Sequence, residues 1–225
     1  MSETPLRIDF QGEELHLHPQ GVIWWTATRT LILSDVHLGK SATFRSHGLP
    51  VPEGETLDDL RRITQLVSRF QAESLIIVGD FFHSSISLTD QFKTTLNQWL
   101  TELPSEVVLI VGNHDPSARK LTDFPLLRAT PAYQRRALHF VHDPSDAPPD
   151  SPTITGHLHP LCRIGTQAGP AIRVRCFLLS GPILTLPAFG TFTSGNLVRQ
   201  FPGPHRLFPI IGKLVCHHPQ NSHPS

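Results

Sequence analysis

Apolar residues gather in short uninterrupted runs along this chain, and polar residues or glycines end each run. Runs of this length are typical of strands that are buried on both faces. The first two runs flank Gln11-Gly12-Glu13 and predict an opening hairpin. Strands are expected at residues 6–10, 14–17, 22–25, 30–33, 74–78, 107–111 and 138–141.

Two stretches repeat apolar residues every three or four positions instead. This spacing puts them on one face of a helix and predicts helices at residues 56–70 and 88–103. Between the first strands and the first helix, residues 40–55 carry two glycines and two prolines and predict a loop. Alternating strands and helices indicate an α/β fold whose polar site residues follow the carboxyl ends of strands.

The later part of the chain is richer in expected strands. A strand at 153–155 and a hairpin of 172–179 with 183–186, around Ser180-Gly181-Pro182, predict a second sheet packed on the first. Prolines and histidines dominate from about residue 201 onward. We therefore expect one domain over residues 1–211 and a loose tail over residues 212–225.

The composition narrows the class of protein. The 225 residues include 39% hydrophobic residues, enough for a real core, and nineteen Lys and Arg balance nineteen Asp and Glu. This balance argues against strong binding to nucleic acid through charge alone. The three cysteines lack the spacing of a metal site and are expected to be free thiols. The start of the chain does not resemble a signal peptide, and no apolar stretch is long enough to span a membrane. These features predict a soluble cytoplasmic protein.

Ligand-type residues follow the expected strands in five blocks. Two-residue spacing in an extended stretch would turn Asp35 and His37 to the same side, and the carboxylate of Asp80 has two oxygens that can bridge two metals. Taken alone, any block has an ordinary reading as a turn or cap. Their ordered combination predicts a two-metal phosphoesterase site formed by Asp35-Val36-His37, Gly79-Asp80, Gly112-Asn113-His114-Asp115, His142 and Gly156-His157-Leu158-His159.

This series, over residues 31–160, resembles the calcineurin-like metallophosphoesterase superfamily. The resemblance implies an α/β two-sheet sandwich flanked by helices. It also implies two metals joined by a bridging carboxylate, with a histidine beside them as transition-state stabiliser or general acid. In this chain the resemblance implies that Asp35, His37 and His159 bind the first metal and that Asn113, His142 and His157 bind the second. Asp80 would bridge the two metals. His114 would be the transition-state stabiliser or general acid, and Asp115 would orient it.

The fourth block departs from the family pattern. Many members have glycine after the histidine, whereas Asp143 follows His142 here, and His139 lies three residues earlier. Residues three apart in a strand point to opposite faces, so only one of these two histidines can face the metals. We favour His142 because it lies at the end of the expected strand.

The loops near the blocks bear on the substrate. Gly79 to His83 resembles a segment of the double-strand-break repair nucleases, which implies that His83 lies near the scissile phosphate; otherwise it is a loop histidine. Lys40 and Arg45 are candidates to hold a substrate phosphate, and Phe44 to stack on a base. The alternative, with equal weight, is that the charges of Lys40 and Arg45 are exposed to solvent and that Phe44 packs against the protein.

The late segment from Leu186 to Gly195 resembles the ligase-associated DNA-damage-response endonucleases. This resemblance implies a manganese-dependent phosphodiesterase or endonuclease that acts on DNA and is linked functionally to a DNA ligase and a helicase. Iron and zinc also suit the ligands. A small-nucleotide phosphodiesterase is the alternative, and the intact blocks argue against a non-catalytic scaffold. Basic residues after the third block are candidate DNA contacts or solvated charges, namely Arg119, Lys120, Arg128, Arg135 and Arg136.

Overall fold

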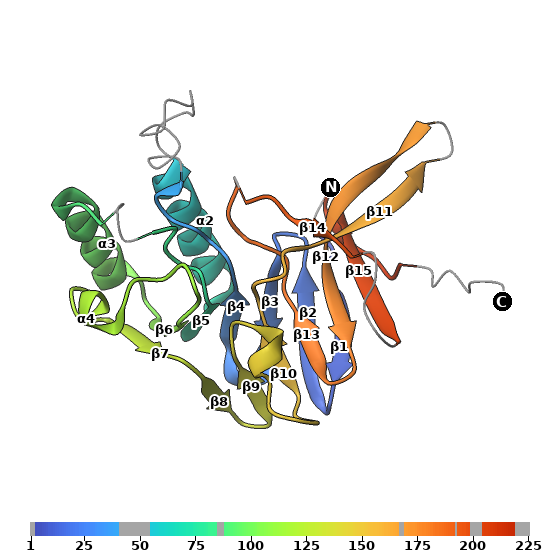
Figure 1. Cartoon of the computed structure of the whole chain (residues 1–225), viewed down its shortest axis with the longest axis horizontal. Helices are drawn as coiled ribbons and strands as arrows, with labels where there is room; N and C mark the ends of the chain where they lie inside the picture. Colours follow the sequence, from blue (N-terminus) through green and yellow to red (C-terminus); the bar gives the residue numbers. More distant parts are fainter. Residues whose placement is uncertain are drawn as a thin grey trace.

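The computed structural model describes residues 3–40, 55–84, 88–166, 169–191, 193–198 and 204–218. Two β-sheets pack face to face, and helices cover the outer face of the first sheet (Figure 1). The expected α/β two-sheet sandwich flanked by helices is confirmed. No helix in these ranges combines the length and the apolar character that crossing a bilayer requires.

The first sheet has seven strands in sequence order. The pairs from β1 to β4 are antiparallel, and those from β4 to β7 are parallel. The parallel strands therefore end at a common edge. The strands are β1 (Leu6–Phe10), β2 (Glu13–His18), β3 (Val22–Trp25), β4 (Thr30–Leu33), β5 (Ser74–Val78), β6 (Glu106–Ile110) and β7 (Leu127–Thr130).

Continuous apolar runs form the central strands because each strand is buried on both faces. In β4, Leu31 and Leu33 pack toward the helices, while Ile32 packs into the core between the two sheets. In β5, Ile76 and Val78 face that second core and Ile77 faces the helices. The side chains alternate with the two-residue period of a strand, and both sides are apolar.

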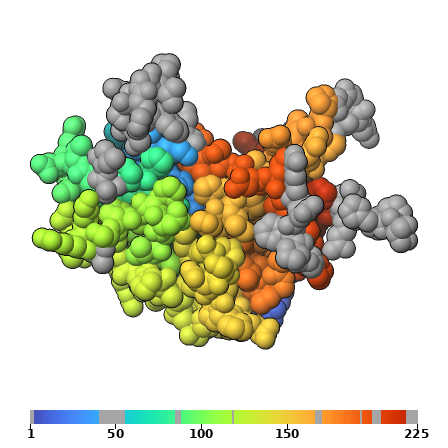
Figure 2. Space-filling view, in the orientation of Figure 1, coloured from blue at the N-terminus to red at the C-terminus, as the bar shows by residue number. Residues whose placement is uncertain are grey.

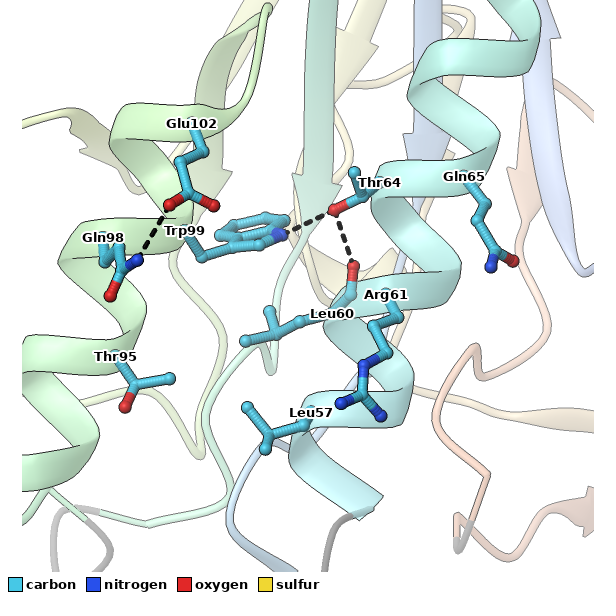
Figure 3. A pocket seen from close by; sticks show the side chains of 9 residues that line it. All are labelled: Leu57, Leu60, Arg61, Thr64, Gln65, Thr95, Gln98, Trp99 and Glu102. Carbon is cyan, nitrogen blue, oxygen red and sulfur yellow. Dashed lines mark hydrogen bonds between the residues drawn. The ribbon is translucent and has the colours of Figure 1, made fainter.

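Three α-helices are described, and the first two pack side by side on the first sheet. The Thr89 hydroxyl caps α3 by accepting a hydrogen bond from the Phe92 amide at 3.2 Å. A cavity of about 430 Å³ lies between α2 and α3, where Trp99 donates to Thr64 at 2.9 Å (Figure 3). None of the predicted site residues lines it. The helices are α2 (Glu55–Phe70), α3 (Asp90–Glu102) and α4 (Ala118–Leu121), with 3-10 turns η1 (Thr26–Thr28) and η3 (Pro144–Asp146).

The second sheet runs in the order β14-β11-β12-β13-β10-β9-β8, with β15 also paired to β12 and β16 to β15. Its longest strand, β12, forms with β11 a ribbon that projects beyond the body of the molecule (Figure 1). The strands are β8 (Tyr133–Arg135), β9 (Leu138–Phe140), β10 (Thr153–Thr155), β11 (Pro160–Thr166), β12 (Gly169–Ser180), β13 (Ile183–Thr185), β14 (Asn196–Leu197), β15 (His205–Ile211) and β16 (Leu214–Val215).

The C-terminal region corrects one expectation. The segment expected as a loose tail from residue 212 begins with β16, which pairs with β15, and Val215 donates to the Thr4 carbonyl at 3.4 Å. Residues 212–218 therefore belong to the fold, because sheet pairing satisfies their backbone groups. The remainder, residues 219–225, lies outside the described residues.

Candidate metal centre

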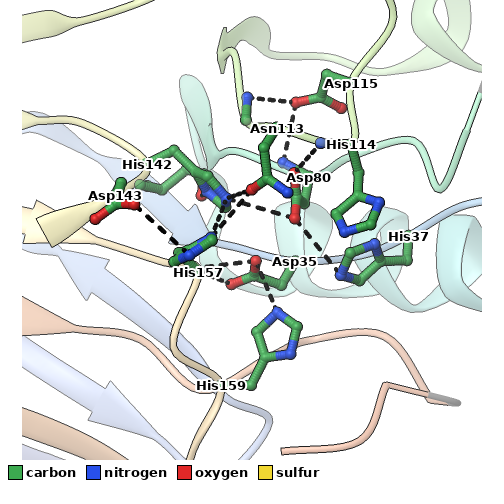
Figure 4. Close-up of polar contacts among 12 residues, drawn as sticks. Asp35, His37, Asp80, Asn113, His114, Asp115, His142, Asp143, His157 and His159 are labelled. Atoms are coloured by element: carbon green, nitrogen blue, oxygen red, sulfur yellow. Dashed lines mark hydrogen bonds and ion pairs between the residues drawn. The ribbon is translucent and has the colours of Figure 1, made fainter. Parts of the chain in front are cut away.

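The five predicted blocks meet at one place in the fold. Three of them follow β4, β5 and β6, whose parallel pairing puts their carboxyl ends at one edge of the first sheet. The other two follow β9 and β10, which are parallel neighbours in the second sheet. The site therefore lies where the edges of both sheets meet, and Figure 4 shows its side chains converging.

Among the described residues, two groups of potential metal-ligating atoms contain a carboxylate, and they share one, while a third group consists of His37, His83 and His114. Asp80 belongs both to a group with Asp35, His37 and His159 and to a group with His142 and His157. Within each group the ligand atoms lie within 4.8 Å of one another. A carboxylate common to two donor groups is what a bridged metal pair requires.

Asn113 joins the second group. Its Oδ1 lies 3.1 Å from Nε2 of His142 and 3.0 Å from Nδ1 of His157. The rival His139 lies within β9 and belongs to neither group among the described residues. The geometry therefore favours His142, which lies two residues beyond the end of that strand.

The backbone of the first block differs from the expected extended stretch. Asp35 and His37 have φ angles of 55° and 54°, in the left-handed region that non-glycine residues rarely adopt. Asp80, His157 and His159 also have positive φ, from 45° to 69°. Each such residue costs about 1–2 kcal/mol, so the surrounding structure has to hold it, and such strain gathers at functional sites.

Hydrogen bonds to the loop that follows β5 hold the first block in this strained conformation. The Asp35 amide donates to the Gly79 carbonyl at 3.0 Å, and the His37 amide donates to the Asp80 carbonyl at 2.9 Å. Glycine is required at position 79, since a Cβ there would lie 2.0 Å from Nδ1 of His142. Its φ of 79° also suits glycine.

The electrostatics of the buried groups suit a cation. Asp35 and Asp80 are 0% and 2% exposed, so two carboxylates lie away from water. Burial lowers the pKa of His142, but its hydrogen bond to Asp80 and the charge of Asp35 raise that pKa overall, to about 9. A histidine drawn to the charged form indicates negative potential that a metal cation would neutralise.

His37 responds in the opposite direction. Burial, opposed by the charges of Asp80 and Asp35, lowers the pKa of His37 to about 4, so its imidazole is neutral. Both of its buried ring nitrogens lack a hydrogen-bond partner among the described residues. Neutral imidazole is the form that binds metals, and an unsatisfied buried nitrogen is costly without a ligand. The donor set therefore fits divalent metals.

Carbonyl groups orient two of the histidines. Nδ1 of His142 donates to the Val78 carbonyl at 3.1 Å, and Nδ1 of His159 donates to the Ser194 carbonyl at 3.0 Å. These bonds leave each Nε2 facing the carboxylates, a common arrangement around metal-binding histidines. Ser194 belongs to the late segment and was not predicted as a site residue.

The late segment packs directly on the first block. The Phe189 amide donates to the Ser34 carbonyl at 2.9 Å, and the Gly190 amide donates to the Asp35 carbonyl at 3.1 Å. A Cβ on Gly190 would lie 2.3 Å from the Val36 carbonyl oxygen. Gly190 is thus a signal, readable in the sequence, that the backbone of the late segment lies close to that of the first block.

Two further histidines line a cleft beside the donor groups. The rings of His83 and His114 are nearly parallel, with centroids 5.7 Å apart, and the ring of His37 lies 5.1 Å from that of His114. The cleft has a volume of about 420 Å³. Its lining consists of His83, Ser84, Asn113, His114, Asp115, Pro116, Ser117 and Lys120.

The other predicted substrate contacts are Lys40, Phe44, Arg45 and the basic residues after the third block. Burial first, and then the charge of Lys40, lower the pKa of His83, so the Lys40 ammonium acts on this cleft. Phe44 and Arg45 lie outside the described residues. Of the basic residues after the third block, Arg128, Arg135 and Arg136 contact Glu106, Thr30 and Glu13.

Asp115 makes contacts other than the expected one with His114. Its carboxylate accepts hydrogen bonds from the amides of Asp80 at 2.9 Å, Phe82 at 2.9 Å and Gly112 at 2.8 Å. Burial raises its pKa to about 7, although the Phe82 and Gly112 amides favour the charged form. Its described bonds connect the loops after β5 and β6, so Asp115 positions the backbone that carries the predicted ligands Asp80 and Asn113.

Replacing Asp115 with alanine is expected to lower the free energy of unfolding by about 3 kcal/mol, because three amides lose their acceptor at about 1 kcal/mol each. Urea denaturation measures this loss. Asp58→Ala is the control, since the Asp58 side chain is 65% exposed and its ion pair is with Arg61, three residues along the same helix. Equal losses in the two variants would contradict the positioning role of Asp115.

Comparison with known proteins agrees with this geometry. A family model for calcineurin-like phosphoesterases matches residues 28–220, while no sequence among curated proteins matches the chain. Among solved structures, the Pseudomonas putida nuclease MPE is similar with a TM-score of 0.75 and 28% identity, covering 92% of this chain and 97% of that one. The E. coli phosphoesterase Yfce has a TM-score of 0.41 and 17% identity, covering 80% and 87%. This chain belongs to the calcineurin-like phosphoesterase family and is a metal-dependent phosphoesterase.

Proposed function

We propose that this protein is a dinuclear metal-dependent phosphodiesterase that hydrolyses DNA, with endonuclease activity. The observation that carries the proposal is the Asp80 carboxylate shared by two groups of metal-type ligands beside an open cleft. Similarity to a nuclease over 92% of the chain supports a nucleic-acid substrate.

Seven side chains would hold the metals. Oxygen and imidazole donors without a thiolate suit manganese, and they also accept iron or zinc. When bound, the metal pair lowers the pKa of a water molecule and neutralises charge on the phosphate. The proposed ligands are Asp35, His37, Asp80, Asn113, His142, His157 and His159.

The histidines of the cleft would act on the substrate. The His114 amide donates to Oδ1 of Asp80 at 2.9 Å, which holds this residue beside the metals. Its imidazole would donate a proton or hydrogen bond to the leaving oxygen, and His83, stacked on it, would contact a non-bridging oxygen. Lys40, with Phe44 and Arg45, is proposed to bind the flanking nucleotide.

Cleavage assays with Mn²⁺ test the function. We expect hydrolysis of single-stranded or duplex DNA, and His114→Ala is expected to lower kcat on DNA by about 10²-fold. His139→Ala is the control, because His139 lies outside both ligand groups. If the enzyme cleaves a chromogenic diester well but neither form of DNA, the proposal fails in favour of a small-nucleotide phosphodiesterase.

The biological setting rests on the late segment. Its resemblance to the ligase-associated endonucleases supports a role in DNA damage response or repair in the cytoplasm, linked to a DNA ligase and a helicase. The contacts of Phe189 and Gly190 with the first block support a functional part for this segment. Sensitivity of a deletion strain to DNA-damaging agents, rescued by the wild-type chain but not by the His114→Ala variant, tests this role.

A further inference from the structure

The zero net charge of this chain hides a strong separation of charge along it. All nineteen Asp and Glu residues lie before residue 151. Residues 151–225 contain six Lys and Arg and no acidic residue. A charge asymmetry of this kind is typical of proteins that contact polyanions, so the balanced total is compatible with a local nucleic-acid surface.

The β11–β12 ribbon concentrates this positive charge. It stands out from the body of the molecule in orange (Figure 2). Arg163 of β11 lies directly opposite Arg173 of β12 in the antiparallel register. Like charges directly across a strand pair are destabilising, so their placement calls for a compensating anion.

The surroundings of the two arginines do not supply that anion. Both residues are exposed, and neither forms an ion pair within the described ranges. Other exposed arginines in the protein do have acidic partners, since Arg7 pairs with Glu14 at 3.1 Å and Arg128 with Glu106 at 3.6 Å. The arginine pair is therefore available to an external ligand.

The pair lies on the inward face of the second sheet, beyond the edge of the core. Along β12 the side chains alternate, so Arg173 shares a face with Arg175, Phe177 and Leu179. Phe177 and Leu179 are buried between the two sheets. The same face thus changes from apolar to basic where the ribbon leaves the body.

This basic face begins beside the metal centre. Nη1 of Arg175 donates to the Ala188 carbonyl at 3.0 Å. The next two residues after Ala188 bond to the backbone of Ser34 and Asp35. Arg163 follows the ligand His159 by four residues, about 13 Å along an extended strand, which brings it within reach of phosphates adjacent to the scissile one.

We propose that Arg163 and Arg173 form a phosphate-binding pair that holds the DNA backbone to one side of the scissile bond. Two guanidinium groups on opposite strands can grip one phosphate or two successive phosphates through paired hydrogen bonds. The anion then offsets their mutual repulsion. This inference rests on the proposed DNA substrate and assigns the track along which that substrate runs.

The test is the salt dependence of DNA binding by the Arg163→Gln/Arg173→Gln double variant. Fluorescence anisotropy in a His114→Ala background, which slows cleavage, gives the affinity at several salt concentrations. Loss of two phosphate contacts is expected to reduce the slope of log K against log salt by about 1.8 for duplex DNA and about 1.4 for single strands. The matched control is Arg7→Gln/Arg61→Gln, which removes the same charge from two exposed arginines that pair with Glu14 and Asp58 and should leave the slope unchanged.

The inference would be overturned if the double variant had the same salt slope as the His114→Ala protein, or if its slope fell no more than that of the control. Either result would indicate that the arginine pair binds another anion, such as an acidic protein surface. If the double variant folds poorly, each single variant is expected to lose about half of the slope change. The proposed function fails by a different result, namely wild-type protein that hydrolyses a small diester but neither binds nor cuts DNA.

Discussion

Asp80→Asn is expected to lower phosphodiesterase activity by about 10³-fold, equivalent to about 4 kcal/mol of transition-state stabilisation. Asp80 is the one side chain that belongs to both mixed carboxylate–histidine groups described at this centre. Its Oδ2 lies 3.4 Å from Nε2 of His142 and 3.8 Å from Nε2 of His37. Asparagine keeps the shape but removes the charge, so it cannot bridge two cations.

Two measurements check this prediction. Steady-state kinetics with Mn²⁺ gives the loss in kcat/KM, and elemental analysis is expected to show fewer than two metals bound per chain. Asp58→Asn is the control, because Asp58 lies on the exposed face of α2 and pairs with Arg61 at 2.8 Å. A variant at Asp80 that keeps two metals and most of its activity would refute the bridging role.

Gly112→Ala is expected to reduce kcat/KM by about 10²-fold or more, although it adds one methyl group. A Cβ at this position would lie 2.4 Å from Oδ1 of Asp80, 2.6 Å from the Asp80 amide nitrogen and 2.9 Å from Cδ2 of His142. The Asp80 amide cannot move away from the added methyl group, because it donates a hydrogen bond to the Asp115 carboxylate. The loop that carries the ligands must shift, and a displacement of about 1 Å in a catalytic site costs about 10²-fold.

Gly165→Ala is the matched control, since a Cβ there meets no atom within 4 Å. It should keep wild-type kinetics and wild-type metal content. Urea denaturation of Gly112→Ala separates a displaced site from an unfolded chain, and we expect a loss of about 1–3 kcal/mol from overpacking. Activity and metal content at the wild-type level would show that the β6 loop tolerates the methyl group and that our account of the close approach is wrong.

The central strands could be predicted because their physics is local. The expected ranges 30–33 and 74–78 agree with β4 (Thr30–Leu33) and β5 (Ser74–Val78). Each of these strands has a helix layer on one side and a second sheet on the other, so every position after the first residue is apolar. The helix over 56–70 was equally readable, because only one of its faces packs on the sheet.

The outer strands of the second sheet were harder to predict. β15 (His205–Ile211) contains Pro209 and Arg206, and its partner β12 lies far away along the chain. Strand formation there depends on that pairing rather than on a local pattern. The same reason explains the error at residue 212, where β16 is held by β15 and by Thr4.

The sequence by itself determined the residue types of the site, their order and their position after strands. Strand ends and ligand chemistry depend on residues that are close together in the chain, so both can be recognised in the sequence. Tertiary structure alone decided how they combine. The His157 amide bonds to the carboxylate of Asp35, 122 positions away, at 3.2 Å. Contacts between the two sheets also set the sharing of Asp80 with His142 and His157 and the preference for His142 over His139. The bonds of Asp115 to the Asp80 and Phe82 amides depend on the pairing of β5 with β6. Neither depends on the nearest neighbours of a residue in the chain.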